Sequence, residues 1–269
     1  MTGTSPGMPL GAHDLAIELS RAAGALLRAK LHERRVIAHK GVIDLVTDAD
    51  RAAESLIAER LRVAFPDHQL LGEEGARSDA VASQASPYRW VIDPLDGTTN
   101  YTHGYPHFAV SIGLEREGDP ILGAVYDPML DELFVAQTGC GATLNGVRLA
   151  VSSATTLIDS LLATGFPYDL ERRRESNALW EAFNERAQGV RRAGSAALGL
   201  CYVAAGRLDG YWERPLRPWD MAAGAIIITE AGGQISRLDG EPFTIDAGEI
   251  VATNRHLHAP MLEIIRERT

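Results

Sequence analysis

The sequence contains few cysteines, almost no lysine and no long hydrophobic run. Its two cysteines, Cys140 and Cys201, have neither metal-binding nor redox-motif spacing, so we expect reduced thiols. No apolar run reaches the ~18 residues of a transmembrane helix. No basic stretch followed by an apolar segment opens the chain, which argues against a secretory signal. We therefore expect a cytoplasmic protein with no membrane partner.

Positive charge is also scarce. The chain has 26 Lys and Arg against 36 Asp and Glu, a net charge of −10. A nucleic-acid-binding protein needs a basic face for the phosphates, so this charge argues against a nucleic-acid partner. Acidic groups gathered in a cleft would instead attract divalent cations, which in turn would attract an anionic substrate.

The pattern of apolar residues changes near residue 150. Before it, helical periodicity at 13–30 and about 48–64 is followed by predicted strands at 69–71, 88–92, 107–115, 120–126, 133–135 and 143–149. After it, predicted strands and helices alternate at 161–165, 174–187, 190–192, 196–205, 210–213 and 221–231. We predict a disordered tail (1–12), an N-terminal α+β part with an antiparallel sheet (13–150) and a C-terminal α/β part (151–269). The two parts would form one compact unit, with the site between them.

Four acidic segments lie where predicted strands or helices begin or end. They are Asp44–Asp50, Gly72–Glu74, Asp93–Asp96 and Trp219–Asp220. Mg²⁺ prefers oxygen ligands, and two such ions roughly 3.5–4 Å apart can hold the attacking and leaving oxygens of a phosphoryl transfer. Each segment alone is as well explained by a turn or a helix cap. Four together are difficult to explain in that way.

Residues 93–99 read Asp-Pro-Leu-Asp-Gly-Thr-Thr and follow the apolar run Trp90–Ile92. A tight turn after this strand would bring the carboxylate of Asp96 near that of Asp93, and the Leu95 carbonyl could face the same cavity. The alternative is that the segment is only an ordinary Asp-Pro turn followed by an Asp-Gly turn, with no metal.

The two residues after Asp96 add a possible anion site. Gly97 allows the backbone to pass close to a ligand. If Gly97 and Thr98 open a helix, their N–H groups can bind a phosphate. The segment therefore combines candidate metal ligands with a candidate phosphate cradle.

With these motifs in place, the sequence resembles the inositol monophosphatase family of Mg²⁺-dependent, lithium-sensitive phosphatases. The resemblance extends from about residue 13 to 265 and rests on the segments Asp44–Asp50 with Glu54, Gly72–Glu74, Trp90–Asn100, His103–Pro106, Gly194–Ala196, Tyr211–Glu213, Trp219–Gly224 and Glu230–Gly233. It implies the layered α-β-α-β-α fold of the sugar phosphatases, and a homodimer, which is common in the family.

The resemblance also implies roles for individual residues. Ligands of a first Mg²⁺ would be Glu73, Asp93 and the Leu95 carbonyl; ligands of a second would be Asp93, Asp96 and Asp220. Glu73 would help to hold a third, weaker ion through water, which makes two or three Mg²⁺ per site. The catalytic water would be oriented by Thr98 and Asp50. The phosphate would be held by the amides of Gly97 and Thr98, and the alcohol would contact Gly194, Ser195, Ala196 and Glu213.

The implied reaction is attack of a metal-activated water on a small phosphate monoester, with no phosphoenzyme. Inositol 1-phosphate is the expected substrate. Fructose 1,6-bisphosphate, histidinol phosphate and 3′-phosphoadenosine 5′-phosphate remain alternatives, as does a non-catalytic metal-binding protein. A second anionic group on the substrate would require basic residues, for which Arg191 and Arg192 are candidates. Where the family often has a lysine, this chain has His39 followed by Lys40.

Overall fold

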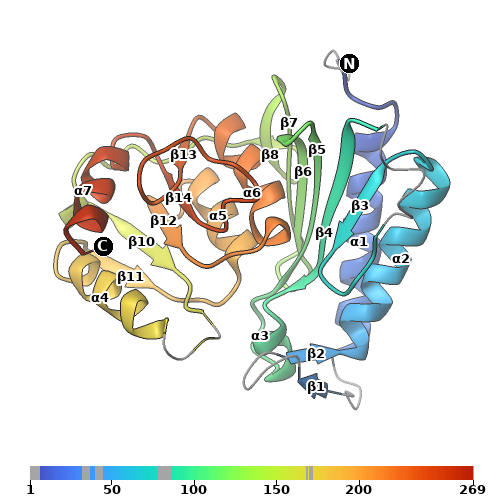
Figure 1. Ribbon diagram of the computed structural model, residues 1–269, viewed down its shortest axis with the longest axis horizontal. Coiled ribbons are helices and arrows are strands. Elements are labelled where there is room, and N and C mark those ends of the chain that lie inside the picture. Colours follow the sequence, from blue (N-terminus) through green and yellow to red (C-terminus); the bar gives the residue numbers. More distant parts are fainter. Residues whose placement is uncertain are drawn as a thin grey trace.

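Helices and sheets alternate in five layers in the computed structural model, which describes residues 7–31, 37–39, 45–77, 86–167, 169 and 172–268 (Figure 1). The first outer layer consists of α1 (Ala12–Lys30) and α2 (Asp48–Ala64), and the second layer is a seven-stranded sheet. The middle layer is α5 (Ala196–Ala204) and α6 (Pro218–Glu230). Beyond it lie a five-stranded sheet and then α4 (Arg173–Asn184) and α7 (His258–Arg268). The α-β-α-β-α architecture is confirmed.

The first sheet contains the strands predicted before residue 150. In spatial order they are β3 (Gln69–Gly72), β4 (Tyr88–Asp96), β5 (Ala109–Arg116), β6 (Asp119–Asp127), β7 (Glu132–Gln137), β8 (Gly141–Leu144) and β9 (Val147–Arg148). Only the β3–β4 pair is parallel among these described strands; the other pairs are antiparallel. The turn between β8 and β9 has φ 48° at Asn145 and 81° at Gly146, as a tight Asn-Gly hairpin requires.

The second sheet is mixed. Its order is β11 (Gly189–Arg191), β10 (Leu161–Thr164), β12 (Gly210–Glu213), β14 (Ile250–Thr253) and β13 (Gln234–Ser236). The strand β10 is parallel to both β11 and β12, whereas β14 is antiparallel to β12 and β13. The predicted α/β alternation therefore holds from β10 to α6. The sequence interpretation missed β13, β14 and α7.

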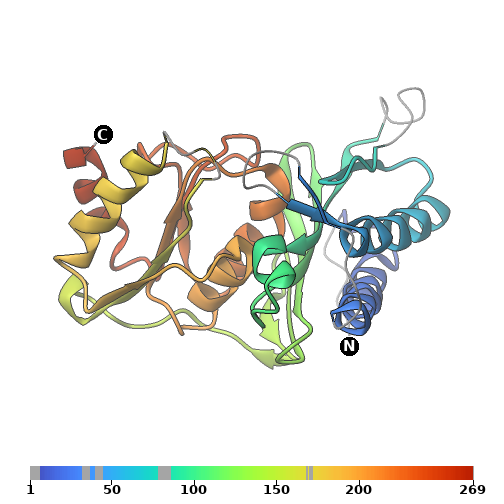
Figure 2. The same cartoon turned by 90° about the horizontal axis from the view of Figure 1, so that it is seen from below.

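Short elements complete the described chain. They are the antiparallel pair β1 (Ile37–His39) and β2 (Leu45–Thr47) before α2, the one-turn helix α3 (Thr98–Thr102) after β4, and the 3-10 helix η2 (Leu157–Asp159). Seen from below, α1 and α2, in blue, lie together on the outer face of the first sheet (Figure 2). In the part of the chain that the structure describes, no helix combines the length and apolarity needed to cross a membrane.

The middle layer joins the two sheets through one apolar core. Both α5 and α6 are apolar on nearly every side, which is the pattern of a buried helix, and most of their residues are buried. This core contains Val125 and Phe134 from the first sheet together with Leu200 and Ile227 from the helices. The division near residue 150 stays a prediction, because the core draws on both sides of it.

Two glycines let α6 lie directly on the first sheet. A Cβ atom on Gly113 would be 2.8 Å from the Cβ of Ala222, and one on Gly123 would be 2.5 Å from the backbone oxygen of Ala223. Backbone atoms cannot swing away as flexible side chains can. The distance between α6 and the sheet therefore depends on the absence of side chains at these positions.

Two stretches differ from the sequence interpretation. The strand β4 does not end at Ile92 but continues to Asp96. Within the predicted tail, residues 1–6 lie outside the described residues, but Tyr88 donates a 2.6 Å hydrogen bond to the Gly7 carbonyl and Met8 packs on the first core. Gly7 and Met8 therefore contact the folded domain. Lys40 and Asp44 also lie outside the described residues.

Replacement of Gly123 by alanine should push α6 away from the sheet. We expect Gly123→Ala to lower the free energy of unfolding by about 2 kcal/mol, the usual cost of overpacking a core. The measurement is urea unfolding of the variant and the wild type. The control is Gly189→Ala on β11, where a Cβ would meet only the movable ends of Arg191 and Leu161. Equal stability of the two variants would contradict this account.

Candidate active site

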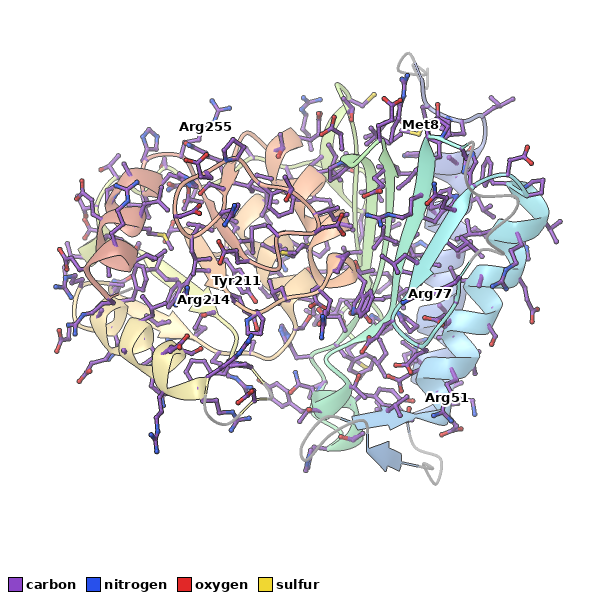
Figure 3. All side chains as sticks on the ribbon, viewed as in Figure 1. Met8, Arg51, Arg77, Tyr211, Arg214 and Arg255 are labelled. Atoms are coloured by element: carbon purple, nitrogen blue, oxygen red, sulfur yellow. The ribbon has the colours of Figure 1, made fainter. Side chains whose placement is uncertain are left out.

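A cavity of about 760 Å³ brings together most of the predicted site residues. It is lined by residues from both parts of the chain, among them Glu73, Asp96, Gly97, Gly194, Ser195, Ala196, Glu213 and Asp220. Tyr211, another lining residue, is labelled in Figure 3 in the half of the molecule that contains the five-stranded sheet. The remaining predicted residues, Asp50, Asp93, Leu95 and Thr98, are buried and are not among the lining residues.

Asp93 lies in an irregular stretch of β4. The register of β4 against β5 shifts between Asp93 and Asp96, so the strand bulges instead of ending in the tight turn that the sequence predicted. Within this bulge, the Leu95 N–H donates a 3.0 Å hydrogen bond to Asp93 Oδ1. The extra residues of a bulge re-aim side chains, which allows Asp93 and Asp96 to approach one cluster from one strand.

The charges that act on the pKa of Asp93 identify its acidic neighbours. Asp93 is 2% exposed. Burial raises its pKa well above the usual value, and the charges of Glu73, Asp96 and Asp220 together with a hydrogen bond to Glu73 raise it further. Three acidic side chains from three segments of the chain thus raise the electrostatic energy of the charged form of Asp93.

Asp96 connects the first sheet to the N-terminus of α5. Its Oδ2 accepts hydrogen bonds from the Ser195 hydroxyl at 2.5 Å and from the Ala197 N–H at 2.8 Å. The Ala196 N–H donates to Oδ1 at 3.3 Å. Burial raises the pKa of Asp96, while these hydrogen bonds oppose the rise. Ser195 and Ala196, predicted to contact the alcohol, therefore also hold an acidic member of the cluster.

Asp220 occupies the first turn of α6, which begins with Pro218. Proline suits this position because its fixed φ matches the helix and no N–H is lost. The Asp220 carboxylate accepts a 2.6 Å hydrogen bond from the Arg217 N–H. Burial raises the pKa of Asp220, and the charges of Asp96, Glu73 and Glu213 add to the effect.

The predicted Thr98–Asp50 pair is in contact. The Thr98 Oγ1 lies 3.1 Å from Asp50 Oδ1 and 3.1 Å from the Leu95 carbonyl oxygen. The other carboxylate oxygen of Asp50 accepts hydrogen bonds from the Thr47 N–H at 2.8 Å and the Thr47 hydroxyl at 2.5 Å. Burial raises the pKa of Asp50 against these hydrogen bonds. The carboxylate that caps α2 is therefore also the partner of Thr98.

The donor set fits a hard divalent cation in its chemistry, since all the candidate ligands are oxygen atoms. The carboxylates raise one another's pKa, yet among the described residues no three His, Cys, Asp or Glu side chains are arranged to hold a metal ion. Asp96 and Asp220 direct oxygen atoms to backbone N–H groups instead. Rotation of these side chains changes the distances between their oxygen atoms but leaves the cluster in place.

Glu213 forms another wall of the cavity. It is half-buried and accepts a hydrogen bond from the Tyr211 hydroxyl. Burial raises its pKa from 4.5 to about 7, the nearby charge of Asp96 also raises it, and the hydrogen bond from Tyr211 and the charge of Arg192 lower it. Near neutral pH this group is able to accept or donate a hydrogen bond.

Only one of the two candidate arginines, Arg191 and Arg192, lines the cavity. Arg192 lines the cavity and its guanidinium lies 5.6 Å from the centre of the Phe166 ring. Arg191 does not line it and donates to the carbonyl of its neighbour Val190. Arg191 ends β11 and Arg192 follows it. Because side chains alternate along a strand, the sequence could have indicated that the two point in opposite directions. It does not indicate which of them faces the cavity.

Arg172 and Arg217 also line the cavity. Arg172 opens the run Arg172–Arg174, for which the sequence allows a solvated helix start, a subunit contact or a contact at the rim of the substrate site; Arg217 carries no motif and was missed. Asn100 was inside a motif without a role; its amide donates to the carbonyls of His107 and Ala193 at 2.7 and 2.8 Å, which ties the segment after β4 to the segment before α5. His103 and His107 do not line the cavity.

Comparison with known proteins agrees with this fold and site. Residues 12–269 match the inositol monophosphatase family. The inositol-1-monophosphatase of Synechocystis sp. is 45% identical over 94% of this chain and 88% of its own. The solved inositol monophosphatase of Anabaena (Nostoc) sp. has a TM-score of 0.85 at 44% identity, covering 96% of both chains. The extragenic suppressor protein suhB of Bartonella henselae has a TM-score of 0.90 at 37% identity, covering 95% of this chain and 98% of its own.

The layered fold and the acidic cavity between its sheets define a phosphatase that acts on phosphoric monoesters. More particularly, the chain belongs to the inositol monophosphatase family. Members of this family generally depend on metal ions, which agrees with the all-oxygen donor set.

The raised pKa of Glu213 predicts a pH-dependent cost to stability. Between the unfolded value of 4.5 and the folded value of about 7, the folded protein binds a proton that the unfolded chain releases. Stability from this group is therefore lost as pH rises through that window. Glu213→Gln keeps an oxygen for the Tyr211 hydroxyl and removes the charge. In urea unfolding with a chelator present, the variant should match the wild type near pH 4.5 and exceed it at pH 8. Parallel profiles would contradict the assignment.

Proposed function

We propose that this phosphatase hydrolyses the phosphate monoester of a small polyol, inositol 1-phosphate foremost, with Mg²⁺ as its cofactor. The observation that carries the proposal is the cluster of Glu73, Asp93, Asp96 and Asp220 with the Thr98–Asp50 pair in contact beside it. A metal site that served only stability would have no use for a buried hydroxyl held by a carboxylate.

The residues divide into two sets of candidate ligands. Glu73, Asp93 and the Leu95 carbonyl would hold one Mg²⁺, and Asp96 and Asp220 would hold a second that shares Asp93. When bound, the ions supply a more acidic water and neutralise charge on the phosphate oxygens. Glu73 would also help to hold a third ion through water.

The protein groups around the ions have their own tasks. Thr98 lies between Asp50 and the Leu95 carbonyl, so its hydroxyl is oriented to accept a hydrogen bond from the attacking water and pass its own proton toward Asp50. Gly97 has φ 95°, a conformation that favours glycine and lets its amide, with that of Thr98, approach the phosphate.

The polyol would occupy the other end of the cavity. Glu213 can accept hydrogen bonds from ring hydroxyls, and Gly194, Ser195 and Ala196 line the same space. The names of relatives support this choice of alcohol, since proteins 45% and 44% identical to this chain are named inositol monophosphatases.

Asp93 provides the direct test of the metal role. Asp93→Asn keeps an oxygen for the Leu95 N–H and removes the shared charge. Loss of a group that hydrogen-bonds to a metal ligand typically costs roughly 10- to 100-fold in activity, so loss of a shared ligand itself should lower Mg²⁺-dependent phosphate release by roughly 100-fold or more. The melting temperature measured with a chelator should not fall, because repulsion within the cluster decreases. The matched control is Asp119→Asn, an exposed carboxylate at the start of β6. Full activity of Asp93→Asn would refute the bridging role.

A second candidate substrate is a sugar bisphosphate. Arg172, Arg192 and Arg217 line the same cavity as the acidic cluster, and in the described structure none of the three forms an ion pair with a carboxylate. A substrate with a second phosphate would place it against these guanidinium groups. Phosphate release from inositol 1-phosphate, fructose 1,6-bisphosphate, histidinol phosphate and 3′-phosphoadenosine 5′-phosphate, with and without Mg²⁺, decides between the substrates. Release from none of them would favour a non-catalytic protein.

Arg192 should discriminate between the two substrate classes. We expect Arg192→Gln to raise the KM for fructose 1,6-bisphosphate about tenfold, the loss of one charge-assisted hydrogen bond. The KM for inositol 1-phosphate should stay within about twofold. Arg191→Gln is the control, because this neighbour lies outside the cavity. An equal effect of Arg192→Gln on both substrates would exclude a role in binding the second phosphate.

A further inference from the structure

A buried carboxylate on α2 lies under the loop that carries Glu73. Glu54 is 5% exposed. Its Oε2 accepts a 2.7 Å hydrogen bond from the Glu74 N–H, and its Oε1 accepts one of 2.7 Å from the Ala76 N–H. Hydrogen bonds to an ionised acceptor are about twice as strong as neutral ones. Glu54 therefore binds the backbone on both sides of the loop's tip.

The loop is closed around this carboxylate. The Gly72 N–H donates to the Ala76 carbonyl at 2.8 Å, and the Glu73 N–H donates to the Ile92 carbonyl at 3.2 Å, one residue before Asp93. A Cβ atom on Gly72 would overlap the Glu54 carboxylate. The residue before Glu73 is thus glycine because the carboxylate passes directly against its backbone.

The spacing on α2 links Glu54 to the other half of the site. Asp50 and Glu54 are four residues apart, so both lie on one face of the helix. Asp50 contacts Thr98, and Glu54 holds the segment after Glu73. One helical face therefore sets the position of Thr98 relative to Glu73. α2 is itself held against β4 and α1 by buried Ala53, Ile57 and Leu61.

From this geometry we propose that Glu54 is a positioning residue, which holds Glu73 in the orientation that the metal site requires. The proposal rests on the proposed metal-dependent phosphatase function. Glu54 does not line the cavity, so it acts through the loop backbone and not by contact with the substrate. The competing explanation is that Glu54 only stabilises the fold by satisfying two buried N–H groups.

The test compares Glu54→Gln with Glu59→Gln. Glutamine keeps the size of the side chain, but its NH₂ group cannot accept from one of the two amides. Glu59 is an exposed glutamate on the same helix and provides the matched control. Three quantities are measured on each protein: the concentration of Mg²⁺ that gives half-maximal phosphate release, the Mg²⁺-induced rise in melting temperature without substrate, and the hydrogen-exchange rates of the Glu74 and Ala76 amides.

If Glu54 positions Glu73, Glu54→Gln should raise the half-saturating Mg²⁺ concentration about tenfold. This is the usual effect of losing a group that holds a metal ligand in place. The rise in melting temperature caused by Mg²⁺ should shrink, and both amides should exchange about tenfold faster. At saturating Mg²⁺, kcat should stay within about threefold of the wild type. Glu54→Asp keeps the charge on a shorter side chain and should give intermediate values, and it replaces Glu54→Gln if that variant does not fold.

A purely structural role predicts a different result. The melting temperature without Mg²⁺ would fall, while the half-saturating Mg²⁺ concentration and the Mg²⁺-induced shift would equal those of Glu59→Gln; this outcome overturns the proposal. Failure of the proposed function is separate, because the wild type itself would then release no phosphate in a Mg²⁺-dependent manner.

Discussion

The structure is organised around the repulsion between carboxylates that are buried close together. Burial and mutual charge raise the pKa of Asp93 and of Asp220 well above their ordinary values, so the folded chain spends free energy to keep them adjacent. A buried charge is tolerated only when other groups compensate it. Much of the fold can be understood as the source of that compensation.

Three helix N-termini supply it. Asp50 lies in the first turn of α2 and Asp220 in the first turn of α6. Asp96 comes from β4 but accepts N–H groups at the start of α5. Helix N-termini carry partial positive charge and unpaired N–H groups, each favouring a carboxylate by roughly 0.3–1 kcal/mol. The layered arrangement directs these helix ends toward the space between the sheets, which is why a single strand bulge at Asp93 can meet groups from both halves of the chain.

The sequence predicted the participants of the site better than their contacts. Acidic residues at element ends, the Asn-Gly hairpin and the buried helices follow from local patterns, so Asp93, Asp220 and α6 were predictable from the sequence. The bulge that continues β4 to Asp96 was not, because Pro94 and Gly97 indicate a turn unless the pairing with β5 is known. The hydrogen bond from Ser195 to Asp96 joins residues 99 positions apart, and no local rule predicts it. β14 was missed because pairing with β12, not local periodicity, makes 250–253 a strand, and β13 depends in turn on its pairing with β14.

The same constraint explains the packing of the central layer. The carboxylate of Asp220 reaches the cluster only if α6 lies close to the first sheet, and this closeness requires Gly113 and Gly123 opposite Ala222 and Ala223. Glycine weakens a strand by roughly 0.5–1 kcal/mol relative to alanine. Both positions therefore lower the stability of the sheet, and the stability of the sheet does not explain why they are glycine. Gly72 above Glu54 is a third case, in which a side chain is omitted so that a carboxylate can approach the backbone. In each case the absence of a side chain lets an acidic group, or the helix that carries one, pack closely enough to reach its position in or beside the site. The positions of these glycines are therefore set by the geometry of the acidic cluster as much as by the stability of the sheet.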